Sequence, residues 1–329
     1  MMNGVTVTSS APSDTTTETT ARRAPAVTSR PAEFYSAGLR LAARVYTSTD
    51  SADSSGEVGG RRPGIVVCNG MRGVKEWIVP PFGEYFAAAG YVALVFDHRG
   101  MGESDGAQGR VVPTDQIEDV RSAITFLTTL PEVDPDRIVL WGTSYGGANA
   151  ICAAAVDKRV KAVATQVPFG DWGRVMRQTL PADKYDALMA DIEVDRAQRV
   201  RTGVSALTSP DRMLDNDESR AAKARSAADV GERPELLFSY ESVEASFEYR
   251  PEEVAHAVSP RPLLIIGSSI DTVTPFSEAQ SLYDHAGEPK SLLSMDIGHY
   301  AICEPPGSDQ AAQLAVDFLA PVVFGDPQS

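Results

Sequence analysis

Three side chains have the types and the order along the chain that nucleophilic acyl chemistry requires: Ser144, Asp271 and His299. A serine hydroxyl is a poor nucleophile at neutral pH, so it needs a base within hydrogen-bond reach, and that base needs an acidic partner that fixes its tautomer. Such a set can attack a carbonyl carbon and hold the acyl group on the serine. We therefore predict Ser144 as nucleophile, His299 as base and Asp271 as the acid that orients the base.

The local sequence around Ser144 supports this role. Residues 142–146 read Gly-Thr-Ser-Tyr-Gly, an apolar run at 137–141 precedes them, and 148–156 are rich in small helix-forming residues. A strand that passes into a helix through a tight, glycine-flanked turn lifts the serine hydroxyl clear of a sheet. A five-residue pattern with two variable positions also arises by chance, so the prediction depends on the other two side chains.

Asp271 and His299 are distinguished by their positions. Asp271 follows the apolar run at 262–267, and His299 follows a strand predicted around 292–295, with Gly298 directly before it. Both side chains are therefore expected in loops that follow strands, as Ser144 is. In the alternative, Asp271 only forms a turn and His299 is a surface loop residue. That alternative does not explain why all three side chains are expected in loops that follow strands.

Charge that develops on a carbonyl oxygen must be met by fixed hydrogen-bond donors. We predict the backbone N–H of Tyr145 as one donor of this oxyanion hole, because it follows the nucleophile at the start of a helix. The second donor is predicted to be the N–H of Met71, where Gly70 allows close approach of the backbone. An ordinary turn at Asn69-Gly70 is the alternative.

The elements that must position these groups alternate between short apolar strands and amphipathic helices. This alternation, after an opening hairpin near residues 33–46, predicts an α/β fold with a mostly parallel sheet and helices on both faces. The strand rhythm stops between residues 170 and 253, which contain helix-like segments. We predict a core from residues 33–169 and 254–322, with 170–253 inserted as a helical cap.

The cap is expected to supply substrate contacts, with Phe169, Trp172 and Tyr249 near its ends as candidate pocket walls. Arg72, on the loop after an early strand, is a further candidate that could contact an anionic group. Two alternatives stay open: the insertion can be a solvated decoration with no substrate role, and each of these side chains can be structural.

Composition narrows the function classes. The net charge of −15 argues against nucleic acid and anionic membranes as partners, because both attract clustered positive charge. The three cysteines have no metal-ligand spacing, so no metal site is predicted and reduced thiols are expected. Residues 1–32 are rich in Ser and Thr without the apolar core of a signal peptide, so we expect a disordered tail on a cytoplasmic protein.

The motifs resemble the α/β-hydrolase superfamily over about residues 33–320. Asn69-Gly70, the run from Asp97 to Ser104 and the run from Gly142 to Gly147 are similar to the dienelactone-hydrolase-like and X-Pro-dipeptidyl-peptidase-like branch. The resemblance implies an α/β-hydrolase fold with a triad of Ser144, His299 and Asp271, in the chain order expected of that fold. Dienelactone hydrolases proper use a cysteine nucleophile, whereas this chain has Ser144.

These observations predict a serine hydrolase that cleaves a carboxylic ester, thioester or lactone of a small-molecule acyl substrate, without a cofactor. Cleavage of an amide or an activated carbon–carbon bond, and cyclisation of the acyl group in natural-product tailoring, use the same triad and stay open. A hydrolase-fold binding protein with an idle triad is a rival of another class. The sequence leaves the oligomeric state undecided, with a homodimer among the allowed states.

Overall fold

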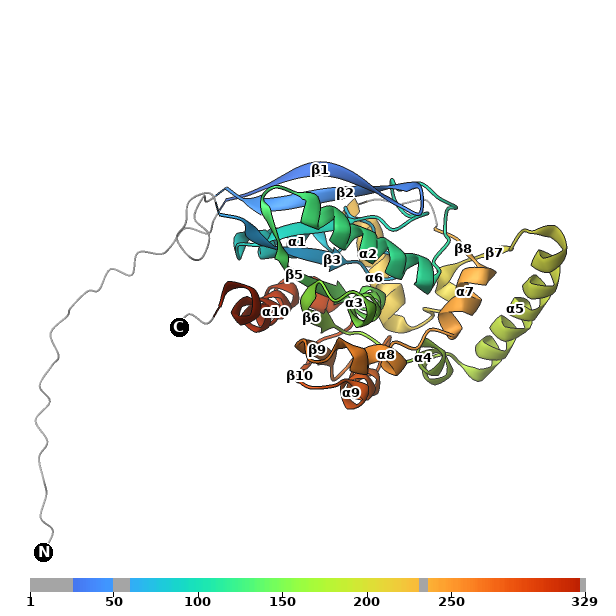
Figure 1. Cartoon of the computed structure of the whole chain (residues 1–329). Coiled ribbons are helices and arrows are strands. Elements are labelled where there is room, and N and C mark those ends of the chain that lie inside the picture. The colour runs from blue at the N-terminus through green and yellow to red at the C-terminus, as the bar shows by residue number, and fades with distance from the viewer. Residues whose placement is uncertain (1–25, 50–59, 231–235, 326–329) are drawn as a thin grey trace, which may run out of the picture.

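A sheet of eight strands forms the centre of the molecule (Figure 1). The computed structural model describes residues 26–49, 60–230 and 236–325. The strands lie in the order β1-β2-β4-β3-β5-β6-β9-β10, and only β1 and β2 give antiparallel pairings within this sheet. Their bounds are β1 Val27–Ser36, β2 Leu39–Ser48, β3 Arg62–Cys68, β4 Val92–Phe96, β5 Val133–Thr143, β6 Val160–Gln166, β9 Leu263–Ser268 and β10 Lys290–Met295.

Helices cover both faces of the sheet and bury its central strands on both sides. On one face, alternate residues of β3, β4 and β5 pack against α2, α3 and α9. On the other face, the intervening residues pack against α1 and α10. Each strand thus presents apolar side chains to two helical layers, which explains its continuous apolar sequence. The bounds are α1 Pro80–Ala88, α2 Pro113–Thr129, α3 Tyr145–Val156, α9 Phe276–His285 and α10 Gly307–Phe324.

This architecture confirms the predicted fold class, but it moves one predicted boundary. The tail was expected to extend to residue 32, whereas β1 begins at Val27 and pairs with β2 along its whole length. Residues 27–32 are mostly exposed on this edge strand, so their polar sequence carries no apolar signal. The rest of the expected tail, residues 1–25, lies outside the described residues.

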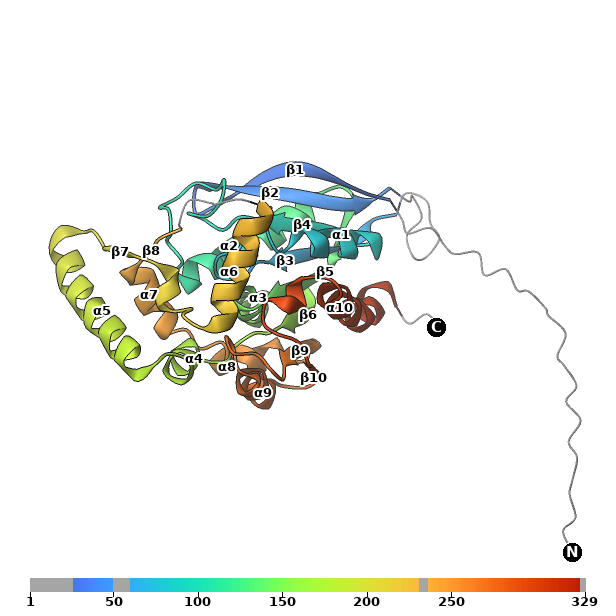
Figure 2. The same ribbon diagram turned by 180° about the vertical axis from the view of Figure 1, so that it is seen from behind.

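Between β6 and β9 the chain leaves the sheet and forms a mostly helical segment, here called the β6–β9 segment (residues 167–262, described except for 231–235). Its helix α5 projects away from the sheet in both views (Figures 1 and 2). The bounds are α4 Trp172–Thr179, α5 Ala182–Thr202, β7 Leu207–Thr208, η1 Pro210–Arg212, α6 Asp217–Val230, β8 Phe238–Ser239, α7 Tyr240–Phe247, α8 Glu252–Ala255 and η2 His256–Val258.

The β6–β9 segment is attached to the sheet by an apolar layer and by an ionic cluster. The apolar layer joins Trp172, Leu188 and Val243 of the segment to Tyr145 at the start of α3. In the ionic cluster, Arg174 of α4 donates to Glu252 of α8 and Glu278 of α9, at distances from 2.7 to 2.9 Å. Within the described ranges, no helix is long and apolar enough to cross a membrane.

Candidate active site

Ser144 lies on the turn between β5 and α3, where the backbone is strained. Its φ is +53°, a left-handed value that is uncommon for a residue with a side chain. A Cβ added to Gly142 would lie 2.3 Å from the carbonyl oxygen of Gly146, and one added to Gly146 would lie 2.3 Å from the carbonyl oxygen of Cys68. Only glycine fits at these two positions, so the sequence pattern arises from the packing of the turn.

The structure brings Ser144, His299 and Asp271 into one line of hydrogen bonds. Ser144 Oγ lies 3.1 Å from His299 Nε2, and His299 Nδ1 lies 2.7 Å from Asp271 Oδ2. In the neutral histidine this geometry assigns the proton to Nδ1, which donates to the carboxylate, and leaves Nε2 free to accept from the serine hydroxyl. His299 and Asp271 are buried, which limits competition from water.

The two loops that carry Asp271 and His299 are neighbours because β9 and β10 pair in parallel, with Met295 opposite Ser268. Asp271 Oδ1 accepts from the backbone N–H groups of Val273 and Thr274, both at 2.7 Å. Thr274 Oγ1 lies 3.0 Å from Asp271 Oδ2, to which it can donate. Sequence reasoning missed Thr274, although a hydroxyl three residues after the aspartate was an available signal.

Met71 and Tyr145, whose backbone N–H groups are the predicted oxyanion donors, are close to Ser144 in the chain or in the pocket. Gly70 and Met71 line the same pocket as Ser144, and Tyr145 is the first residue of α3. In the described part of the chain, no acceptor is found for the N–H of Met71 or of Tyr145. Both groups can therefore donate to an oxygen atom of a bound molecule.

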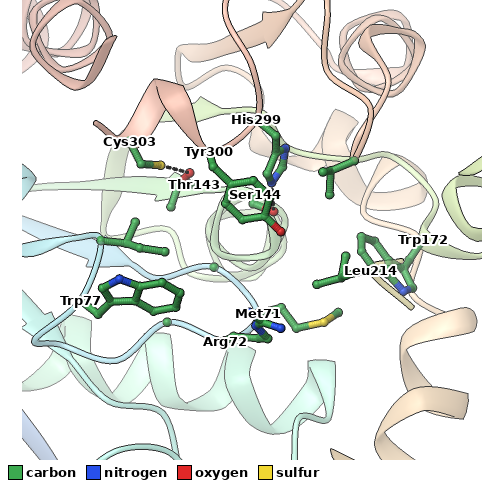
Figure 3. Close-up of a pocket in the computed structure, with 14 residues that line it drawn as sticks. Met71, Arg72, Trp77, Thr143, Ser144, Trp172, Leu214, His299, Tyr300 and Cys303 are labelled. Atoms are coloured by element: carbon green, nitrogen blue, oxygen red, sulfur yellow. Dashed lines mark hydrogen bonds between the residues drawn. The ribbon is translucent and has the colours of Figure 1, made fainter. Parts of the chain in front are cut away.

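A pocket with mostly apolar walls surrounds Ser144 (Figure 3). In the close-up, Trp77 and Cys303 lie on one side of the serine, and Trp172 and Leu214 lie on the other. The lining consists of Gly70, Met71, Arg72, Gly73, Trp77, Ile78, Thr143, Ser144, Trp172, Leu214, Val273, His299, Tyr300 and Cys303. Apolar side chains thus flank the nucleophile on both sides within one pocket.

Two of the four predicted pocket candidates are not on its walls. Trp172 and Arg72 line the pocket, whereas Phe169 and Tyr249 pack behind Tyr145, with ring centroids 5.5 and 5.4 Å from its ring. The Tyr249 hydroxyl donates to Asn149 at 3.0 Å, which satisfies it inside the core. These two aromatic side chains therefore support the start of α3, and this placement corrects the expectation for them.

Other lining residues had no recognisable signal in the sequence. Trp77 and Ile78 come from the loop before α1, and Leu214 comes from the β6–β9 segment. Cys303 follows His299 by four residues, and burial raises the pKa of its thiol to about 11. A neutral thiol is a weak nucleophile, so Ser144 remains the only group of this pocket that has a base beside it.

The eight-stranded sheet, with a nucleophile elbow at the end of its fifth strand, defines an α/β-hydrolase, and the protein is an enzyme of the serine-hydrolase type. The chain belongs to the Hydrolase_4 family, described as serine aminopeptidase, S33, which it matches over residues 60–300.

Three relatives illustrate what the chain is similar to. An uncharacterized 31.7 kDa protein of Escherichia coli from the traX-finO intergenic region is 32% identical over 263 residues, which are 79% of this chain and 91% of that protein. A thiohydrolase of Eupenicillium brefeldianum is 28% identical over 275 residues, or 79% of this chain and 86% of the relative.

The third relative is GrgF, a polyketide transferase of Penicillium, which is 27% identical over 238 residues, covering 70% of this chain and 79% of its own length. Its crystal structure, from Penicillium sp. sh18, superposes with a TM-score of 0.74 at 23% identity and covers 90% of this chain and 99% of that chain. This structural likeness shows a shared fold.

Proposed function

We propose that the protein cleaves a carboxylic ester, thioester or lactone through an acyl-enzyme on Ser144. The observation that carries the proposal is the line of hydrogen bonds from Ser144 Oγ through His299 to Asp271, which begins inside a pocket with mostly apolar walls. A nucleophile, a base and an acid in this arrangement are what acyl transfer through serine requires.

The proposed reaction uses each of these groups in turn. As Ser144 Oγ attacks the carbonyl carbon, its proton passes to His299 Nε2, and the negative charge of the tetrahedral intermediate is held by the N–H groups of Met71 and Tyr145. His299 then gives the proton to the leaving alcohol or thiol, and a water molecule cleaves the acyl-enzyme by the same route. Asp271 stabilises the imidazolium that exists between these steps.

The proposed substrate carries a medium-sized, largely apolar acyl group. Trp77 lies on one side of Ser144, and Trp172 and Leu214 lie on the other, so the acyl chain and the leaving group can each remove apolar surface from water. Among the three bonds proposed, the thioester has additional support, because one relative is named a thiohydrolase.

The proposal also assigns a role to the segment inserted between β6 and β9. We infer that residues 170–253 act as the substrate-contacting cap, since Trp172 and Leu214 line the pocket.

The motifs at residues 97–104 and 142–147 support the dienelactone-hydrolase-like and X-Pro-dipeptidyl-peptidase-like branch. The free thiols of Cys68, Cys152 and Cys303 support a cytoplasmic location, because reduced cysteines are usual there.

Covalent labelling tests the proposal directly. A fluorophosphonate probe is expected to label Ser144, and a p-nitrophenyl ester is expected to release nitrophenol. Both signals should be lost in Ser144→Ala and kept in Ser29→Ala, which changes a serine on the edge strand β1. Unchanged turnover in Ser144→Ala would exclude the mechanism.

Acyl transfer to a nucleophile other than water is a second candidate, favoured by the relative that is named a polyketide transferase. Apolar pocket walls exclude water and would leave the acyl-enzyme available to an alcohol or amine. Incubation of the enzyme with an acyl thioester and a series of alcohols separates the two reactions, because hydrolysis gives only the free acid whereas transfer gives the new ester.

A further inference from the structure

We propose that Glu218 is a positioning residue that ties together the two loops that carry Asp271 and His299. The inference rests on the proposed function, since it concerns the same triad. Glu218 lies in the first turn of α6, in the β6–β9 segment, and is separated from Asp271 by more than fifty residues of sequence. Its carboxylate reaches both loops at once.

One oxygen of this carboxylate holds the loop that carries the acid. Thr272, the residue after Asp271, donates its hydroxyl to Glu218 Oε2 at 2.8 Å, and its backbone N–H lies 3.4 Å from the same oxygen. Asn216 adds a longer contact from the same segment, with its Nδ2 3.4 Å from the carbonyl oxygen of Thr272. The acid loop is therefore attached to the start of α6.

The other oxygen holds the loop that carries the base. The backbone N–H of Tyr300, the residue after His299, donates to Glu218 Oε1 at 3.3 Å. Next to it, Ser219 Oγ and the Tyr300 hydroxyl lie 3.1 Å apart. A Cβ added to Gly298, the residue before His299, would lie only 2.6 Å from Glu218 Oε1, so the glycine leaves space for the carboxylate.

This bridge bears on catalysis because Asp271 and His299 come from different strand ends. Their 2.7 Å hydrogen bond holds only if the two loops keep their spacing, and the β9–β10 ladder ends at Ser268 and Met295, before either side chain. A carboxylate can accept hydrogen bonds from both loops simultaneously, because both of its oxygens are acceptors. Glu218 acts through Thr272 and Tyr300 and has no contact with the reacting atoms.

The bridge also connects the β6–β9 segment to the chemistry. The same segment supplies Leu214 to the pocket wall, four residues before Glu218. The stretch of the segment that lines the pocket is therefore continuous in sequence with the residue that ties the two loops.

Glu218→Gln tests the bridge, because an amide nitrogen cannot accept from an N–H group and one loop must lose its partner. We expect kcat for a p-nitrophenyl ester to fall about 10-fold or more while KM stays within about twofold, since a misplaced base slows chemistry more than it weakens binding. Asp217→Asn is the matched control. It removes the same charge from the adjacent, exposed residue, whose carboxylate pairs only with Arg220 among the described residues, and its kcat should match the wild type.

Gly298→Ala tests the same bridge without changing any charge. The new methyl group is expected to displace the Glu218 carboxylate and to lower kcat in the wild-type background. In the Glu218→Ala background there is no carboxylate to displace, so the same substitution should add little further loss. Additive losses in this double-mutant cycle would mean that Gly298→Ala acts on His299 directly, and would count against the bridge.

A proton NMR measurement separates failure of this inference from failure of the proposed function. The Nδ1 proton shared by His299 and Asp271 should give a far-downfield signal that is assigned by its loss in His299→Gln. We expect it to broaden or vanish in Glu218→Gln and to persist in Asp217→Asn. If wild-type Ser144 is not labelled, the hydrolase proposal fails, while this signal still tests the bridge. A signal that is unchanged in Glu218→Gln overturns the inference even if labelling succeeds.

Discussion

Arg72 and Asp211 form an ion pair at the wall of the pocket, with 3.0 Å between Nη1 and Oδ1. Arg72 belongs to the loop after β3, next to Met71, and Asp211 belongs to η1 of the β6–β9 segment. Asp211 also pairs with Lys223 of α6. The Asp211 carboxylate thus already pairs with the Arg72 guanidinium, the group to which a negatively charged substrate would bind.

The ion pair makes a prediction about substrate charge. Asp211→Asn should lower KM about fivefold for a p-nitrophenyl ester whose acyl chain ends in a carboxylate, because a partly exposed pair of this kind is worth about 1 kcal/mol. KM for the neutral ester of the same length should stay within about twofold of the wild-type value. Steady-state kinetics on the two esters measure this difference. Arg72→Gln should remove any gain, and an equal change for both esters would contradict the prediction.

The glycine requirement at the elbow gives a prediction about folding. In Gly146→Ala the new Cβ would meet the carbonyl oxygens of Cys68 and Asn69 at 2.3 and 2.4 Å, and backbone atoms cannot rotate away. We expect a loss of about 3 kcal/mol in the free energy of unfolding, the upper part of the range for overpacking, and loss of Ser144 labelling.

Gly70→Ala is the matched control for Gly146→Ala. Its added Cβ would have its nearest neighbours at 3.7 and 3.8 Å, which is ordinary contact, so denaturant unfolding should give nearly the wild-type midpoint. The explanation by backbone contact would be wrong if both variants unfolded at the same denaturant concentration.

The fold and the three central side chains were predictable because their signals are local. The apolar runs of the central strands and the glycines around Ser144 are set by neighbours in the sequence or by backbone sterics. Leu214 and Glu218 were not predictable, because their roles depend on how the β6–β9 segment packs over the loops. Trp77 was not predictable because its role depends on how the loop before α1 folds beside Ser144. The exposed first half of β1 was missed for a related reason, since hydrogen bonds to β2 and not apolar burial hold it.

The pocket thiol makes a prediction about chemical labelling. Burial raises the pKa of Cys303 to about 11, so the reactive thiolate is the minor form at neutral pH and grows as the pH rises toward that value. At pH 8 only about one molecule in a thousand carries the thiolate. Alkylation of Cys303 by iodoacetamide, followed by mass spectrometry, should be slow at pH 8 and accelerate about 10-fold per pH unit. Urea-unfolded protein provides the control, and a native rate that equals its rate would contradict the raised pKa of the Cys303 thiol.

The ionic cluster that attaches α4 to the core gives a prediction about stability and pH. Hydrogen bonds from Arg174, opposed by partial burial, hold the pKa of Glu252 below its usual value of 4.5. A carboxylate with a lowered folded-state pKa contributes stability that is fully present above the unfolded-state pKa and is lost as the pH falls through the folded-state pKa. Glu252 should therefore stabilise the protein at pH 7 and lose this effect below about pH 4.5.

Glu252→Gln should lower the free energy of unfolding by about 1–3 kcal/mol at pH 7, because it leaves the guanidinium of Arg174 with a weaker partner. It should also flatten the decline of Tm between pH 5 and pH 3, since one carboxylate no longer takes up a proton on unfolding. Thermal melts across this pH range measure both effects. Glu253→Gln, at the next residue, changes an exposed side chain paired with Arg250 and should leave the wild-type slope. Equal slopes for Glu252→Gln and Glu253→Gln would show that the cluster does not carry the acid sensitivity.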